Sequence, residues 1–141
     1  MPADEIPDRG ERIRRGYDAF NTSDFDLALA GLHPDIVWKP LDLLPDTDTY
    51  HGHEGVVAFW RMWKETIGDF HVDVVETIEQ GNCVVAVIQI RGKGRESAAE
   101  VVTPSFFHVW TFAGDQIVRA AMHATRQGAD EELAMRAGEH T

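Results

Sequence analysis

The spacing of apolar residues in the first third of the chain predicts two helices. From residue 8, apolar side chains recur every three or four positions, as on one face of a helix, at Ile13, Tyr17, Phe20, Phe25, Leu29 and Leu32. The polar segment 21–24 divides this pattern, because its short side chains end one helix and cap the next. Pro34 ends the second helix, since the residue before a proline avoids helical geometry. Arg12 and Arg15 fall outside the apolar face, and we expect them to be solvated.

The third helical pattern is strongly amphipathic and rich in aromatic residues. The sequence YHGHEG at residues 50–55 is a glycine-containing turn. The helix that it opens runs over 55–67, with apolar residues at Val56, Phe59, Trp60, Trp63 and Ile67. A short strand at 36–38 and a turn-rich loop at 41–50 precede it. Because strand-like segments follow, we expect this helix to lie on a sheet.

From residue 70 onward the pattern changes to that of β-strands. Four β-rich segments are separated by turn residues or by a polar hairpin tip; they span 70–79, 83–91, 101–112 and 116–125. Helices followed by hairpin-connected strands predict an α+β domain, with the helices packed on one face of a curved antiparallel sheet. We expect residues 9–127 to form this domain, residues 1–8 a flexible arm, and residues 128–141 a charged tail with a short helix.

The segment 83–91 is apolar on both faces. Ala86, Ile88 and Ile90 alternate with Val85 and Val87, so the two sets point to opposite sides of the strand. An antiparallel sheet commonly leaves one face in water. We therefore expect the outer face of this sheet to meet a second subunit, which predicts a homodimer.

Composition narrows the function classes. Hydrophobic residues make up 43% and charged residues 26% of the 141 positions, which is typical of one folded domain. The net charge of -11 argues against a nucleic-acid or anionic-membrane surface, because both need clustered Lys and Arg. There is no signal-peptide core and no apolar run of about 18 residues, so a cytoplasmic protein is expected.

The sequence offers little metal-binding or redox chemistry. The single cysteine, Cys83, excludes an internal disulfide and a cysteine-based zinc cluster. His51 and His53 form a His-x-His pair, but no third ligand has a predictable place beside them. We therefore predict no metal and no cofactor.

Four segments, in this order, resemble the SnoaL-like branch of the nuclear transport factor 2-like superfamily. They are GYDAFNTSDFDLALAGLHPDIVW, YHGHEGVVAFWRMW, GNCVVAVIQIRGKG and FFHVWTFAGDQIVRAAMHATR. The resemblance implies a cone in which three helices are cupped by a curved antiparallel sheet around a pocket. Members of the superfamily include polyketide cyclases, ketosteroid isomerase, dehydratases, epoxide hydrolases and binding or scaffold proteins, so the fold does not fix the function.

The resemblance also suggests catalytic residues. In ketosteroid isomerase-like sequences a tyrosine at the position of Tyr17 donates a hydrogen bond to a substrate oxyanion, and the position of His108 holds a neutral acid that helps. A histidine there can donate or act as a general base; ordinary core roles for both residues remain alternatives. The family's aspartate base, which precedes a proline, is replaced by Lys39 before Pro40.

A third catalytic candidate, His123, lies near the position where SnoaL-like cyclases carry an acid. If Ala120 and Met122 point inward, His123 points outward toward the expected dimer face, unless a one-residue bulge reverses the phase. Asp42 is a further candidate at the pocket mouth. The residues expected to bind substrate are mostly aromatic, as a hydrophobic small-molecule site requires: Trp38, Asp42, Tyr50, Phe59, Trp63, Phe106, Trp110 and Met122.

Three functions fit these features. The first is a small dimeric enzyme that isomerises, cyclises or dehydrates a hydrophobic carbonyl compound by cofactor-free acid–base chemistry. The second is a binding module that carries a small apolar ligand without turnover, which the lysine at position 39 favours. The third is an interaction scaffold, which predicts a filled cone with no pocket.

Overall fold

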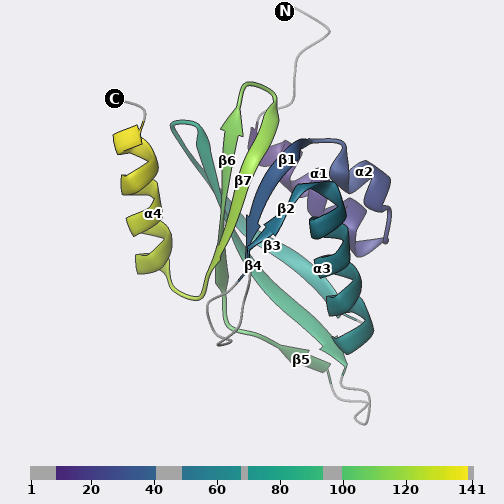
Figure 1. The fold of residues 1–141 in the computed structure, drawn as a ribbon. Coiled ribbons are helices and arrows are strands. Elements are labelled where there is room, and N and C mark those ends of the chain that lie inside the picture. Colours follow the sequence, from purple (N-terminus) through teal and green to yellow (C-terminus); the bar gives the residue numbers. More distant parts are fainter. Residues whose placement is uncertain (1–8, 41–48, 68–69, 94–99, 140–141) are drawn as a thin grey trace, which may run out of the picture.

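The computed structural model describes residues 9–40, 49–67, 70–93 and 100–139 of the chain. It contains the helices α1 (Arg9–Asn21), α2 (Phe25–Leu29), α3 (Gly52–Ile67) and α4 (Arg126–Glu139), and the strands β1 (Leu32–Lys39), β2 (Tyr50–His51), β3 (Phe70–Gln80), β4 (Cys83–Lys93), β5 (Glu100–Val102), β6 (Phe106–Ala113) and β7 (Gln116–His123). The strands form one curved sheet in the order β2-β1-β7-β6-β4-β3, with β5 paired to β4 (Figure 1). Helices α1, α2 and α3 lie on one side of the sheet and α4 on the other (Figure 1). The α+β prediction with a curved sheet is confirmed.

The sheet differs from the prediction in several details. Strand β1 begins at Leu32 instead of at residue 36, and Tyr50–His51 forms an additional short strand, β2. The expected strand 101–112 is divided into β5 and β6, because Pro104 between them has no N–H for the ladder. The segment between β5 and β6 stays hydrogen-bonded to β4, because the N–H of Thr103 donates to the carbonyl of Ile90 at 2.9 Å. In addition β1 pairs with β7 in parallel, whereas every other strand pair is antiparallel.

The inner face of the sheet and the first three helices enclose the main core. The predicted alternation holds in β4, where Val84, Ala86 and Ile88 are buried in this core. Helix α1 turns its apolar stripe, Ile13 and Tyr17, toward the same core. Burial of these side chains is the main force that holds the helices on the sheet.

Polar anchors fix both ends of α1. At its C-terminal end, the Asn21 side chain accepts from the N–H of Val72 and donates to its carbonyl, both at 2.9 Å. The Lys64 ammonium of α3 donates to the carbonyl of Phe20 at 2.8 Å. At the N-terminal end, the Arg9 guanidinium donates to the turn carbonyls of Gly81 and Gly114. These hydrogen bonds fix the position of α1, and with it that of Tyr17, relative to the sheet.

The outer face of the sheet is covered in part by the chain itself. Instead of a short helix within 130–136, the 14-residue α4 packs Ala129 and Leu133 against Cys83, Val85 and Val109. The apolar outer side of β4 is thus explained by an intramolecular contact, which corrects the argument that it needs a second subunit. The homodimer stays a prediction. No helix in the described ranges is long and apolar enough to cross a bilayer.

Candidate functional site

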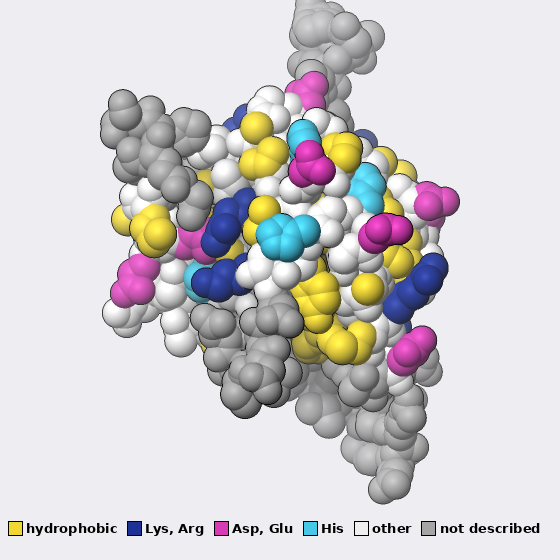
Figure 2. Space-filling model, in the orientation of Figure 1, with side chains coloured by type: hydrophobic (Ala, Val, Ile, Leu, Met, Phe, Trp, Pro, Cys, Tyr) yellow, Lys and Arg dark blue, Asp and Glu magenta, His cyan; other side chains and the backbone are white. Residues whose placement is uncertain are grey.

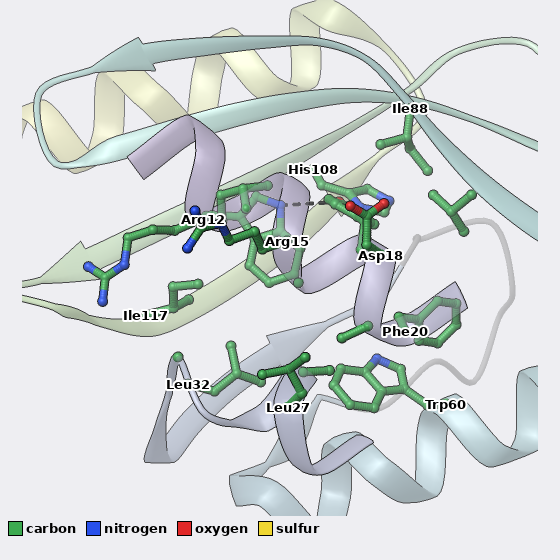
Figure 3. A pocket seen from close by; sticks show the side chains of 18 of the residues that line it. Arg12, Arg15, Asp18, Phe20, Leu27, Leu32, Trp60, Ile88, His108 and Ile117 are labelled. Carbon is green, nitrogen blue, oxygen red and sulfur yellow. Dashed lines mark hydrogen bonds between the residues drawn. The ribbon is translucent and has the colours of Figure 1, made fainter. Parts of the chain in front are cut away.

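A cavity of about 850 Å³ lies between the inner face of the sheet and the first three helices (Figure 3). Its volume falls within the range usual for small-molecule sites. Eight of the predicted site residues line it: Tyr17, Trp38, Phe59, Trp63, Phe106, His108, Trp110 and Met122. Further apolar lining, which the sequence interpretation did not single out for the site, includes Trp60, Phe70, Val72, Ile88 and Ile90.

Strand β6 carries His108, one of the polar side chains that line the cavity. Phe106, His108 and Trp110 alternate along this strand and line the cavity. Trp110 and His108 each have an alanine as the partner on one adjacent strand: Trp110 pairs with Ala120, and His108 with Ala86. These alanines leave room for the rings to rise from the sheet into the cavity.

Tyr17, His108 and Trp110 form a hydrogen-bonded cluster inside this apolar space. The Tyr17 hydroxyl lies 2.5 Å from Nδ1 of His108. The indole N–H of Trp110 donates to the same hydroxyl oxygen at 3.2 Å. The Tyr17 ring also stacks on His108, with centroids 5.9 Å apart, and meets Trp110 edge-on. Two side chains that are 91 residues apart in sequence are thereby joined at one point of the cavity wall.

Burial keeps both ionisable members of this cluster neutral. Removal from water, together with a smaller effect of the charge on His123, lowers the pKa of His108 to about 3. Burial also raises the pKa of Tyr17 above its ordinary value, although the hydrogen bond from Trp110 acts in the opposite direction. At neutral pH the imidazole and the phenol of this cluster are therefore both uncharged.

The donor inventory of the cluster limits where its protons sit. Trp110 can only donate, so the Tyr17 oxygen accepts one hydrogen bond. In one arrangement Tyr17 donates to Nδ1 of His108 and the imidazole carries its proton on Nε2. In the other, Nδ1–H donates to Tyr17, which frees the phenolic proton and leaves Nε2 as an acceptor. The second arrangement gives a ligand one donor and one base, side by side.

Aromatic rings surround the cluster. Trp38 meets Trp110 at 5.4 Å and Trp60 at 5.8 Å between ring centroids, both edge to face. Phe59 contacts Trp38 on one side and Trp63 on the other. Within the described residues, Nε1 of Trp38 is buried with no hydrogen-bond partner. Such a wall excludes water and favours planar, apolar ligands.

Two predicted site residues do not line the cavity, and a third belongs to a segment outside the described residues. Tyr50 packs against Phe59, with ring centroids 5.2 Å apart, and does not itself line the cavity. Asp42 belongs to residues 41–48, outside the described part of the chain. His123 faces away from the cavity, because no bulge reverses its phase, and its Nε2 lies 2.7 Å from Oε1 of Glu132 in α4.

The cavity also reaches residues that the sequence interpretation left in solvent. Arg12 and Arg15 of α1 line its outer part, together with Asp18, on which the sequence interpretation was silent (Figure 3). Residues of α2 and of the turn between β6 and β7 continue this lining. The polar character of the three α1 residues hid them, because apolar periodicity identifies only the core side of a helix. No group of three or more metal-binding side chains occurs in the ranges that the structure describes.

The basic side chains on the visible face of the molecule lie in small separate groups among acidic ones, without a continuous basic patch (Figure 2). This surface agrees with the net charge of -11.

Comparisons with known proteins agree with this architecture. The family model of the SnoaL-like domain matches residues 13–120. An NTF2-like protein of unknown function from Burkholderia pseudomallei is 28% identical, with a TM-score of 0.69, over 86% of this chain and 93% of its own. TerC, crystallised with polyporic acid, is 24% identical, with a TM-score of 0.71, over 88% of this chain and 96% of its own.

A more distant similarity is to a protein from Catenulispora acidiphila with a ketosteroid isomerase-like fold, solved in complex with trimethylamine. It is 12% identical, with a TM-score of 0.69, over 82% of this chain and 86% of its own. Comparison with curated proteins gives no match.

Proposed function

The chain belongs to the SnoaL-like domain family, and we propose that it is a cofactor-free acid–base enzyme acting on a hydrophobic carbonyl compound. One observation carries this proposal: the neutral Tyr17–His108–Trp110 cluster inside an apolar cavity of about 850 Å³. An apolar cavity with a few convergent polar groups and shifted pKa values is typical of a catalytic site. Ligands named for the similar structures, polyporic acid and trimethylamine, support a small-molecule ligand in this fold.

The proposed reaction begins with the carbonyl oxygen of the substrate hydrogen-bonded to the Tyr17 hydroxyl. Nε2 of His108 removes a proton from the carbon next to the carbonyl, and the electron pair of the broken C–H bond moves onto the oxygen. The resulting enolate is held by Tyr17, whose oxygen is itself polarised by the N–H groups of Trp110 and His108. Return of the proton to another carbon gives isomerisation, loss of a leaving group gives dehydration, and attack on a second carbonyl gives cyclisation.

The shifted pKa of His108 sets the limits of this chemistry. A pKa of about 3 keeps the imidazole unprotonated at neutral pH, but it also makes His108 a weak base in the empty cavity. A negative charge that develops on the substrate nearby raises that pKa, since opposite charges stabilise each other strongly where water is excluded. The mechanism therefore favours substrates whose C–H bond is already acidic, such as 1,3-dicarbonyl compounds.

A non-catalytic binding module is the second candidate. The observation that favours it is Lys39 at the end of β1, where ketosteroid isomerases carry a carboxylate base. The acidic side chains that line the described cavity, Asp18 and Asp115, are exposed at its outer part. The scaffold hypothesis is disfavoured, because it predicts a filled cone.

Exchange of carbon-bound hydrogen for deuterium tests the proposal without knowledge of the natural substrate. Aryl ketones and 1,3-diketones of polyketide, steroid and terpenoid type are incubated with the protein in D₂O, and loss of the α-proton signal is followed by NMR. We expect the wild type to accelerate exchange for at least one class. His108→Ala should slow it about a hundredfold or more, and Tyr17→Phe about tenfold or more.

The matched control is His51→Gln, which removes an exposed histidine that does not line the cavity and should leave exchange unchanged. Ligand binding without accelerated exchange would instead support the binding module. Exchange that persists at the wild-type rate in His108→Ala would contradict the assignment of His108.

A further inference from the structure

The lining of the cavity extends beyond the apolar stripe of α1 to Arg12, Arg15 and Asp18, and we call this part of the cavity its outer branch. Gly16 of the same helix and Gly31, just before β1, also line the cavity. A Cβ atom built on either glycine would meet no atom within 4 Å. Glycine weakens a helix interior relative to alanine, so its place in α1 is unfavourable for the helix itself. Because Gly16 has no side chain, the space beside it stays open, and we read this space as a path from the aromatic interior to the outer branch.

A cationic side chain stands at the outer end of this path. Arg12 lines the cavity, and its side chain is only 28% exposed. Within the described residues its one ion pair is with Asp115, at 3.9 Å, which is longer than a hydrogen bond. Asp115 is 74% exposed on the turn between β6 and β7, so water can solvate it readily when the pair opens. Most of the donor capacity of Arg12 is therefore available to a ligand.

Arg12 is the cationic side chain of the outer branch that is best placed to bind a ligand. Arg15 is 64% exposed and already pairs with Glu11 at 3.2 Å, one turn away on the same helix. Asp18 is exposed to solvent, where its charge is screened. Figure 3 shows the long Arg12 side chain on the Ile117 side of the cavity, away from His108.

We propose that Arg12 binds a carboxylate at one end of an elongated ligand whose carbonyl lies at the Tyr17–His108–Trp110 cluster. A guanidinium matches a carboxylate in geometry and can donate two parallel hydrogen bonds to it. Arg12 and Tyr17 are five residues apart on α1, which corresponds to about 7.5 Å along the helix axis. The substrate class is thus an aromatic keto acid with two or more linked rings. This inference rests on the proposed function, since the cluster defines the other end of the ligand.

The test uses one probe in two charge states. The probe is 4′-acetylbiphenyl-4-carboxylate, with its uncharged methyl ester as the matched compound, and binding is measured by calorimetry. We expect Arg12→Gln to weaken the acid about tenfold or more and the ester less than twofold. Asp115→Asn removes the competing carboxylate and should strengthen the acid severalfold. Arg126→Gln, which changes the net charge equally on the other side of the sheet, should change neither.

Two glycine variants test the path itself. Gly16→Leu fills the open space and should weaken both compounds, whereas Gly16→Ala should leave both unchanged. Equal effects of Arg12→Gln on acid and ester, or no effect of Gly16→Leu, would overturn the inference.

His108→Ala separates this inference from the function on which it rests. It should weaken acid and ester alike, because both place the ketone at the cluster. If it does so while Arg12→Gln fails to discriminate, the anchor is refuted and the cluster stands. If His108→Ala affects neither compound, or if neither binds the wild type at millimolar concentration, both proposals fail.

Discussion

Two histidines on neighbouring strands show how differently the two faces of this sheet are used. His108 in β6 pairs across the ladder with Met122, the residue before His123 in β7, so the two histidines are close in register but point to opposite sides. His108 meets a phenol and an indole in an apolar cavity. His123 meets the carboxylate of Glu132, which is also bound by Arg119 at 3.2 Å.

The difference lies in what each face does with charge. On the outer face, burial alone would raise the pKa of Glu132, but hydrogen bonds from His123 and Arg119 outweigh it and the pKa is lowered. The charged carboxylate therefore holds α4 on the sheet. On the inner face no formal charge compensates His108, and its pKa falls instead. The outer polar cluster is built for attachment, and the inner one leaves hydrogen-bonding capacity for a ligand.

The largest effect should come from breaking the outer cluster. The Glu132 side chain is only 7% exposed. Glu132→Ala removes its carboxylate and leaves Arg119 and His123 without their shared partner. We expect the free energy of unfolding, measured by urea denaturation, to fall by about 3 kcal/mol. Binding of the cavity probes should persist, because Glu132 lies across the sheet from the cavity.

The control for this substitution is Glu131→Ala at the adjacent position. The Glu131 side chain is exposed and accepts a hydrogen bond from Gln127 in the same helix. Its substitution should cost less than about 0.5 kcal/mol. Equal losses for the two variants, or loss of probe binding in Glu132→Ala, would show that the faces are not independent.

A smaller effect should appear in the pH dependence of stability. The pKa of His108 is about 3 in the folded protein and near 6.5 when unfolded, so the unfolded chain binds more protons between these values. The contribution of neutral His108 to the free energy of unfolding is fully present above pH ~6.5 and is lost as the pH falls toward 3. Between pH 7 and pH 5 the wild type should lose about 2 kcal/mol more than His108→Gln. Parallel pH profiles for the two proteins would contradict the buried, neutral state.

Much of the inner face could be predicted from the sequence. The period-two spacing of Phe106, His108 and Trp110 puts them on one face of a strand, and the helical stripe puts Tyr17 on the core side of its helix; all four line the cavity. The same alternation left the direction of His123 open, because one bulge would have reversed it. Its partner, Glu132, lies in a stretch of charged residues whose weak amphipathicity gave no sign of a packed helix.

Other features depend on contacts between distant segments. Arg12 and Gly16 become cavity residues only because α2 and the turn between β6 and β7 fold beside α1. Nothing in the local pattern of α1 reports this, since a glycine and an arginine outside the apolar stripe are typical of a solvent-facing surface. The hydrogen bond between Tyr17 and His108 is likewise a product of the tertiary fold.

The central claim is that His108 is a neutral group that faces the ligand, whereas His123 faces away from the cavity and contacts Glu132. Side-chain ¹⁵N NMR of the histidines, recorded from pH 5 to pH 8 with and without 4′-acetylbiphenyl-4-carboxylate, tests it most directly. The account predicts that His108 stays neutral throughout this range and that its nitrogen signals shift when the probe binds, while those of His123 do not. A His108 that titrates near pH 6.5, or a probe that shifts His123 and leaves His108 unchanged, would contradict it.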